Sequence, residues 1–177
     1  ASRFVKINDT CFVYHFPENM AGTVELSVEG KAGIVLRLKH GEMLNEDGTV
    51  NLANIDYHYR PTDDSDPFQT DIVILRDGET RFTPKFNYKG FQYVEVTSSE
   101  PIALDENSIV AFKMHSDVPE IGRFRSSSDL LNKIWTATNN SYLDNLFGYP
   151  TDCPQREKNG WTGDAHIAIE TALYNFD

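Results

Sequence analysis

The stretch VELSVEGKAGIVLRLK, residues 24–39, alternates apolar and polar side chains on either side of a turn that contains glycine. In each of its two segments, every second residue is apolar and would lie on the same face of a strand. These residues are Val24, Leu26, Val28, Ile34, Leu36 and Leu38. In a strand, successive side chains point to opposite faces, so a period of two indicates one buried and one solvated face. The stretch therefore predicts two half-buried antiparallel strands.

The same pattern extends over residues 1–120. Further strand candidates are residues 72–75, 82–88, 91–96 and 109–114. Clusters of Gly, Asp and Asn separate the candidates, and these residues favour the tight turns of hairpins. Many short strands separated by turns are typical of a sandwich. We therefore expect a mainly β fold, with an antiparallel β-sandwich or jelly roll over residues 1–120.

The composition fits a globular protein and excludes several function classes. The chain has 177 residues with a net charge of −11, and 40% of them are hydrophobic and 12% aromatic. An acidic disordered tail would be poor in aromatics, and a nucleic-acid binder would need clustered Lys and Arg. No apolar run approaches the roughly 18 residues that span a bilayer. Cys11 and Cys153 alone provide neither a disulfide framework nor a structural zinc site, and they leave the cellular compartment open.

Near residue 126 the period changes to three and four, which predicts a helix. Ser126, Ser127, Ser128 and Asp129 suit a helix N-terminus, because hydroxyl groups cap it and an acid favours its first turn. The residues that recur at helical spacing are Leu130, Leu131, Ile134, Trp135, Thr138, Tyr142 and Leu146. A second helix should begin near residues 162–164. Residues 121–177 thus form a helical hairpin with two broad apolar faces, and we expect the natural polypeptide to continue into partner helices.

The loop between the helices, DCPQREKNGWTGDA at residues 152–165, carries unusual chemistry. Asp152, Glu157 and Asp164 are accompanied by Arg156 and Trp161. One interpretation is structural: Asp164 caps a helix, Arg156 pairs with a carboxylate and Trp161 fills the hairpin. The alternative is a sugar site, in which carboxylates accept hydrogen bonds from hydroxyl groups and an aromatic face stacks on a pyranose. Neighbouring acids also raise one another's pKa, which lets one act as a general acid.

This loop resembles the signature of the bacterial α-L-rhamnosidases of glycoside hydrolase family 78. The segments 16–22, 38–42, 47–49, 82–86 and 90–96 resemble the β-domain that precedes the catalytic domain in that family. The resemblance implies an (α/α)6 toroid, of which this chain holds the first hairpin, and hydrolysis of terminal α-L-rhamnosyl linkages with inversion. Inverting enzymes use two carboxyl groups, one as acid and one as base.

Site residues follow from the resemblance position by position. Glu157 matches the general acid, while Asp152 and Asp164 match acids that bind the sugar. Arg156 and Trp161 are assigned supporting roles in substrate binding. The family's general base is a Glu further along the helical domain, which we expect beyond Asp177. We therefore expect a rhamnose-containing carbohydrate as substrate, no cofactor, and no activity from the 177-residue chain by itself.

Other candidate sites favour ordinary interpretations. Cys153 lacks an arranged base and is interpreted as structural. The five histidines show no metal-ligand spacing, and residues 63–66 (DDSD) lack the spacing of an EF-hand loop, so a solvated acidic loop is expected there. The sequons at Asn8 and Asn139 carry no functional assignment. The aromatics at 57, 59, 86, 88, 91 and 93 are interpreted mainly as core, with an accessory sugar-binding face as the alternative.

Two rival functions stay open at this point. The chain could be a non-catalytic carbohydrate-binding module with a docked helical tail, or part of another glycosidase built on the same toroid. The length of the parent protein separates the first rival from the enzyme. The sequence indicates neither the linkage preference nor the oligomeric state.

Overall fold

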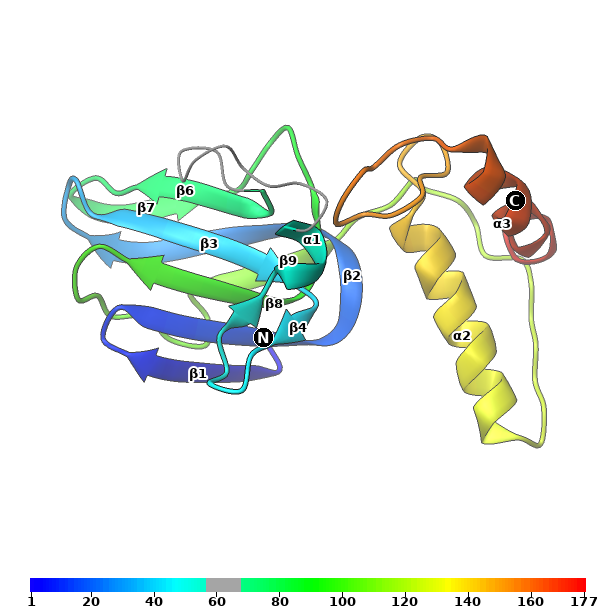
Figure 1. Cartoon of the computed structure of the whole chain (residues 1–177), viewed down its shortest axis with the longest axis horizontal. Coiled ribbons are helices and arrows are strands. Elements are labelled where there is room, and N and C mark those ends of the chain that lie inside the picture. Colours follow the sequence, from blue (N-terminus) through cyan, green and yellow to red (C-terminus); the bar gives the residue numbers. More distant parts are fainter. Residues whose placement is uncertain (57–67) are drawn as a thin grey trace.

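The computed structural model describes residues 1–56 and 68–177. Ten of its elements form or adjoin a β-domain, and two longer helices follow it (Figure 1). In chain order they are β1 (Arg3–Asn8), β2 (Cys11–Gly30), β3 (Val35–Gly41), β4 (Met43–Leu44), β5 (Val50–Asn51), α1 (Ala53–Asp56), β6 (Thr70–Ile74), β7 (Gly78–Phe82), β8 (Lys89–Ser98), β9 (Ile109–Lys113), α2 (Asp129–Asp144) and α3 (Thr162–Asn175).

Strand β2 organises the β-domain because it pairs in two places along its 20 residues. Its first half lies between β1 and β8, within the order β1-β2-β8-β3-β6, and its second half pairs with β9 and β7. The ladder with β8 is irregular between His15 and Met20, where Pro17 cannot donate a backbone hydrogen bond. All pairings are antiparallel, as the alternating pattern predicts.

One hydrophobic core lies within the β-domain. It joins the alternating residues of the quoted stretch, such as Leu26 and Leu36, to Phe91 and Val94 of β8 and Ile109 of β9. The mainly β fold with a C-terminal helical region is thereby confirmed. Burying large apolar side chains contributes roughly 1.5–3 kcal/mol each, so this cluster is the main source of the domain's stability.

The strand predicted at residues 82–88 is wrong. Strand β7 ends at Phe82, and residues 83–88 form an irregular segment that contains Pro84. Proline removes a ladder donor, and Phe86 is 100% exposed, so the alternation of aromatics here does not reflect burial. Of the other aromatics assigned mainly to the core, Phe91 is buried, whereas residues 57 and 59 lie outside the described residues.

The first long helix begins where the serine run predicts, with Asp129 in its first turn. Ser128 occupies the N-cap position, but its side chain makes no capping hydrogen bond. Asn132 instead accepts a hydrogen bond from the Ser126 amide at 2.8 Å and donates to the Ser126 carbonyl at 3.0 Å. Helix α2 is therefore joined to the preceding segment by an amide side chain rather than by a hydroxyl cap.

Helices α2 and α3 contact each other, but much of their apolar surface is exposed to solvent. Trp135 donates its indole N–H to Asn175 at 3.0 Å, and the rings of Tyr142 and Phe176 stack at 5.5 Å. Apolar side chains on both helices are nevertheless exposed: Leu130, Leu131, Ile134, Ile167, Ile169, Leu173 and Tyr174. The prediction that these faces are not buried within this chain is confirmed.

Candidate active site

The loop from Asp152 to Trp161 closes on itself through its backbone. The Asp152 amide donates to the Asn159 carbonyl at 3.0 Å, and the Lys158 amide donates to the Cys153 carbonyl at 3.2 Å. Lys158 has a φ of 56°, in the left-handed region that few residues other than glycine adopt. This conformation turns the chain back immediately after Glu157. The loop is thus a closed turn that presents residues 154–157 at its tip.

Strand β8 supports the loop at close range. A Cβ added at Gly90 would lie 2.9 Å from both the amide nitrogen and the Cβ of Gln155, so only glycine allows this approach. Lys158 donates its ammonium group to the carbonyl oxygen of Tyr88 at 2.5 Å. The β-domain therefore contacts the loop that carries the candidate acids.

Asp152 is held as a carboxylate. Its Oδ1 accepts the Asn159 amide at 2.9 Å, and its Oδ2 accepts the Cys153 thiol at 2.9 Å. Partial burial alone would raise the pKa of Asp152, but these hydrogen bonds outweigh it and lower the pKa. Asp152 is consequently not the acid whose pKa neighbouring carboxylates were expected to raise. It can accept hydrogen bonds from hydroxyl groups instead.

Cys153 is a hydrogen-bond donor in this arrangement. Burial and the neighbouring Asp152 carboxylate raise the pKa of its thiol. A thiol with a raised pKa is a poor nucleophile. Neither Cys11 nor Cys153 forms a disulfide.

Glu157 and Trp161 form a pair. The indole N–H of Trp161 donates to Oε2 of Glu157 at 2.7 Å. The other oxygen, Oε1, accepts no hydrogen bond from residues 1–56 or 68–177. A carboxyl group fixed through one oxygen in this way can carry a proton on the other and present it to a substrate.

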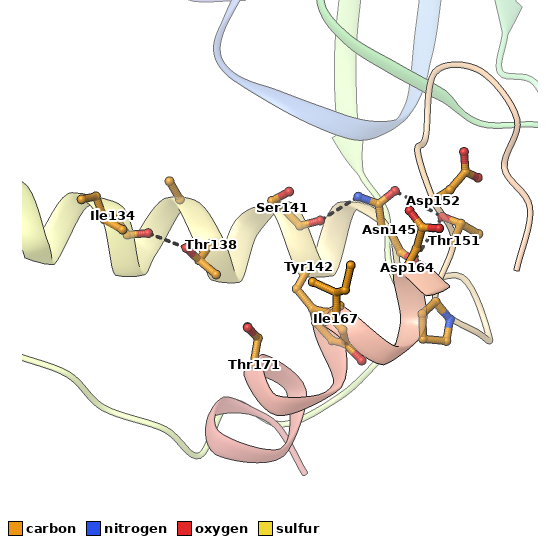
Figure 2. A pocket seen from close by; sticks show the side chains of 13 residues that line it. Ile134, Thr138, Ser141, Tyr142, Asn145, Thr151, Asp152, Asp164, Ile167 and Thr171 are labelled. Carbon is orange, nitrogen blue, oxygen red and sulfur yellow. Dashed lines mark hydrogen bonds between the residues drawn. The ribbon is translucent and has the colours of Figure 1, made fainter. Parts of the chain in front are cut away.

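Asp164 and Asp152 line the same cavity, which lies between α2 and α3 (Figure 2). The cavity has a volume of about 570 Å³, and both acids lie at one end of it, beside Asn145 and Thr151. Asp164 is exposed in the first turn of α3, where the helix dipole favours a negative charge. The remaining lining residues are Ile134, Ala137, Thr138, Ser141, Tyr142, Pro150, Ile167, Ala168 and Thr171. Glu157, Arg156 and Trp161 do not line it.

Comparisons with known proteins assign the chain to a family. Residues 5–115 match the model of the bacterial alpha-L-rhamnosidase concanavalin-like domain, and residues 119–177 match that of the bacterial alpha-L-rhamnosidase 6 hairpin glycosidase domain. The chain belongs to the bacterial alpha-L-rhamnosidase family.

Relatives within the rhamnosidase family match most of this chain, but their own chains are much longer. Alpha-L-rhamnosidases of Streptomyces avermitilis and Formosa agariphila are 36% and 35% identical over 94% and 97% of the chain. The chain spans 15% and 18% of their lengths. Among solved structures, the alpha-L-rhamnosidase from Dictyoglumus thermophilum matches 99% of the chain at 35% identity with a TM-score of 0.84. The L-rhamnose complex of the Streptomyces avermitilis enzyme matches 98% at 34% identity with a TM-score of 0.81. These two matches cover 19% and 16% of the solved chains.

In this rhamnosidase-family loop, the structural interpretation of the signature is wrong on three points. Trp161, not Asp164, occupies the N-cap position of α3. Trp161 is 53% exposed and does not fill the hairpin. Arg156 forms no ion pair within residues 1–56 and 68–177, and its Nε is buried without a hydrogen-bond partner there.

Several residues of the site were not predicted from the rhamnosidase signature. Ser141 of α2 and Asn145, its C-cap, line the cavity beside Thr138, which the helical spacing had already indicated; their spacing of three and four from Thr138 could have indicated them too. Lys158 and Gly90 give no comparable signal, because their roles depend on a contact between distant segments.

The described residues offer no further candidate sites of the kinds considered from the sequence. No group of three His, Cys, Asp or Glu side chains in the described part of the chain could hold a metal ion. The acidic run at residues 63–66 lies outside the described residues. Within residues 1–56 and 68–177, no helix is both long and apolar enough to cross a membrane. Asn139, one of the two sequon residues, is buried within α2.

Proposed function

We propose that the full-length protein hydrolyses terminal α-L-rhamnosyl linkages with inversion, and that Glu157 is its general acid. The observation that carries this proposal is the placement of three acids around one closed loop. Asp152 and Asp164 border the loop and line one cavity, and Glu157 lies between them in sequence with one carboxyl oxygen open.

Four of the five candidate residues then have a chemical role. Glu157 transfers its proton to the glycosidic oxygen, while the bond from that oxygen to C1 breaks and its electron pair stays on the leaving oxygen. A water molecule forms the new bond to C1 and gives its proton to a second carboxylate, which we expect beyond Asp177. Asp152 and Asp164 accept hydrogen bonds from sugar hydroxyls, and Trp161 holds Glu157 in place.

Two domains would share this work. We propose that residues 1–120 form the sandwich and residues 121–177 form the first hairpin of the toroid. The second catalytic carboxylate and most of the sugar pocket would then lie outside the 177 residues. On this view the chain by itself binds no substrate productively, which accounts for the expected inactivity.

The test compares Glu157→Gln with the wild type in the full-length protein. With a phenyl α-L-rhamnoside, we expect kcat to fall about 10²–10⁴-fold while rhamnose binding, measured by calorimetry, is retained. Glu106→Gln, an exposed turn residue of the β-domain, is the matched control and should leave kcat unchanged. NMR of the wild-type reaction should show the β-anomer of rhamnose first.

Other outcomes would reject the assignment. Unchanged turnover by the Glu157→Gln variant would show that Glu157 is not the general acid. Rhamnose binding by a wild-type full-length protein that hydrolyses no rhamnoside would favour the carbohydrate-binding alternative. Clear turnover by the 177-residue chain would contradict the need for a base outside it.

A further inference from the structure

We propose that Lys158 is a positioning residue for the general acid, and that it acts by fastening the Glu157 loop to the start of strand β8. This inference rests on the proposed role of Glu157. It makes the β-domain a structural part of the active site, although none of the five candidate site residues belongs to that domain.

The backbone of Lys158 determines where Glu157 lies. Its left-handed conformation reverses the chain directly after the acid, and its amide closes the loop on the Cys153 carbonyl. Lysine has no intrinsic preference for this conformation, so surrounding contacts must hold it there. The side chain supplies those contacts.

The ammonium group of Lys158 is bound on the β-domain. It donates to the Tyr88 carbonyl at 2.5 Å and lies 4.6 Å from the centre of the Tyr88 ring, a cation–π geometry. The Tyr88 ring in turn stacks on Phe147 at 3.7 Å with an interplanar angle of 5°. Phe147 follows α2, so the ammonium rests on a platform made from both parts of the chain.

The environment of Lys158 shows that the contact is enclosed. Burial, reinforced by the positive charge of Lys89, lowers the pKa of Lys158 to about 8, and Asp71 opposes the shift. Lys89 is itself buried and paired with Asp71 at 2.9 Å. Beside this platform, Gly90 receives the backbone of Gln155. Residues 88–90 thus hold the loop at two points on either side of Glu157.

The test uses the full-length protein and two substrates that differ in their need for an acid. The leaving group of a 2,4-dinitrophenyl rhamnoside departs without protonation, whereas the leaving group of an alkyl rhamnoside must be protonated. Lys158→Met keeps most of the length of the side chain but removes its ammonium group, and with it the charge and the donors. We expect it to lower kcat on the alkyl rhamnoside by about 10–10²-fold, with less than about 3-fold change on the dinitrophenyl substrate and an unchanged KM.

Conservative and control variants separate positioning from general damage. Lys158→Arg retains a cation and donors and should recover most of the lost kcat. Lys31→Met, an exposed position in the turn between β2 and β3, should match the wild type on both substrates. If Lys158→Met does not fold, Tyr88→Leu removes the ring beneath the ammonium and should show a smaller defect with the same dependence on the leaving group.

The possible failures are distinct. Equal losses on both substrates, or wild-type kcat in Lys158→Met, would overturn the positioning role. In the fallback case, a Tyr88→Leu variant without dependence on the leaving group would do the same. A wild-type protein that hydrolyses neither rhamnoside would instead refute the proposed function itself.

Discussion

Replacing Gly90 with alanine tests whether the loop at residues 152–161 contacts strand β8 closely. The added Cβ would lie 2.9 Å from the Cβ and the amide nitrogen of Gln155, and 3.0 Å from Cγ of Pro154. None of these atoms is the end of a flexible side chain, so rotation cannot relieve the clash. Ordinary contact begins near 3.4 Å, so the loop must move away by about 0.5 Å.

The size of the effect follows from this displacement. Overpacking of a well-packed contact typically costs about 1–3 kcal/mol. For a chain of this length each kcal/mol lowers the melting temperature by about 2–4 °C, so we expect Gly90→Ala to melt about 2–12 °C below the wild type. In the full-length protein, kcat should fall about 10-fold, because a displacement of 1 Å at a reacting group can cost 10²-fold.

The assay is thermal unfolding of the 177-residue chain, followed by tryptophan fluorescence. Both tryptophans, Trp135 and Trp161, lie in the helical part, so fluorescence reports whether that part stays docked. Gly163→Ala is the control, because its Cβ would meet nothing within 4 Å and alanine favours a helix. A Gly90→Ala melting temperature equal to that of the wild type would refute the close contact, as would an equal loss in the control.

Two further predictions concern buried ionisable groups in the β-domain, namely His40 and the pair of Lys89 and Asp71. Burial lowers the pKa of His40 to about 4 from its ordinary 6.5, so the unfolded chain binds the proton more tightly. The free energy of unfolding should therefore fall as the pH drops from about 6.5 to about 4, by about 3 kcal/mol in all, in urea titrations at stepped pH. His40→Phe should flatten this dependence, and an unchanged slope would contradict it. Lys89→Met should cost about 3–5 kcal/mol in the same titrations, because it leaves the Asp71 carboxylate buried without its partner. Arg81→Met, in an exposed ion pair with Glu79, should leave the midpoint almost unchanged, and equal effects of the two variants would count against the buried pair.

The alternation of apolar and polar residues predicted the strands of the β-domain correctly where the apolar residues are buried. Leu26 and Leu36 alternate with polar residues and are buried, as expected. The double pairing of β2 could not be predicted, because its partners β8, β9 and β7 lie far away in sequence. The error at residues 82–88 has the opposite cause: aromatic residues alternate there, but Pro84 ends the ladder and Phe86 faces solvent.

In the candidate site, too, local sequence predicted some features, while others depend on contacts between distant segments. The signature indicated Asp152, Glu157 and Asp164, and the structure brings the first and last of these to one cavity. The pairing of Glu157 with Trp161 joins residues four apart and is local. Lys158, by contrast, looks like an ordinary surface lysine in the sequence, and only its contact with Tyr88 reveals its environment.

The position of Glu157, the proposed general acid, therefore depends on two segments about 70 residues apart, as the separation of Lys158 and Tyr88 shows. A helical hairpin without β8 would keep the signature residues but lose the carbonyl, the ring and the glycine that hold the loop. A catalytic group must be held within about 0.5 Å of its working position, and such precision comes from the residues that support it. If Glu157 has its proposed role, the β-domain supports the catalytic site and is not a detachable binding module.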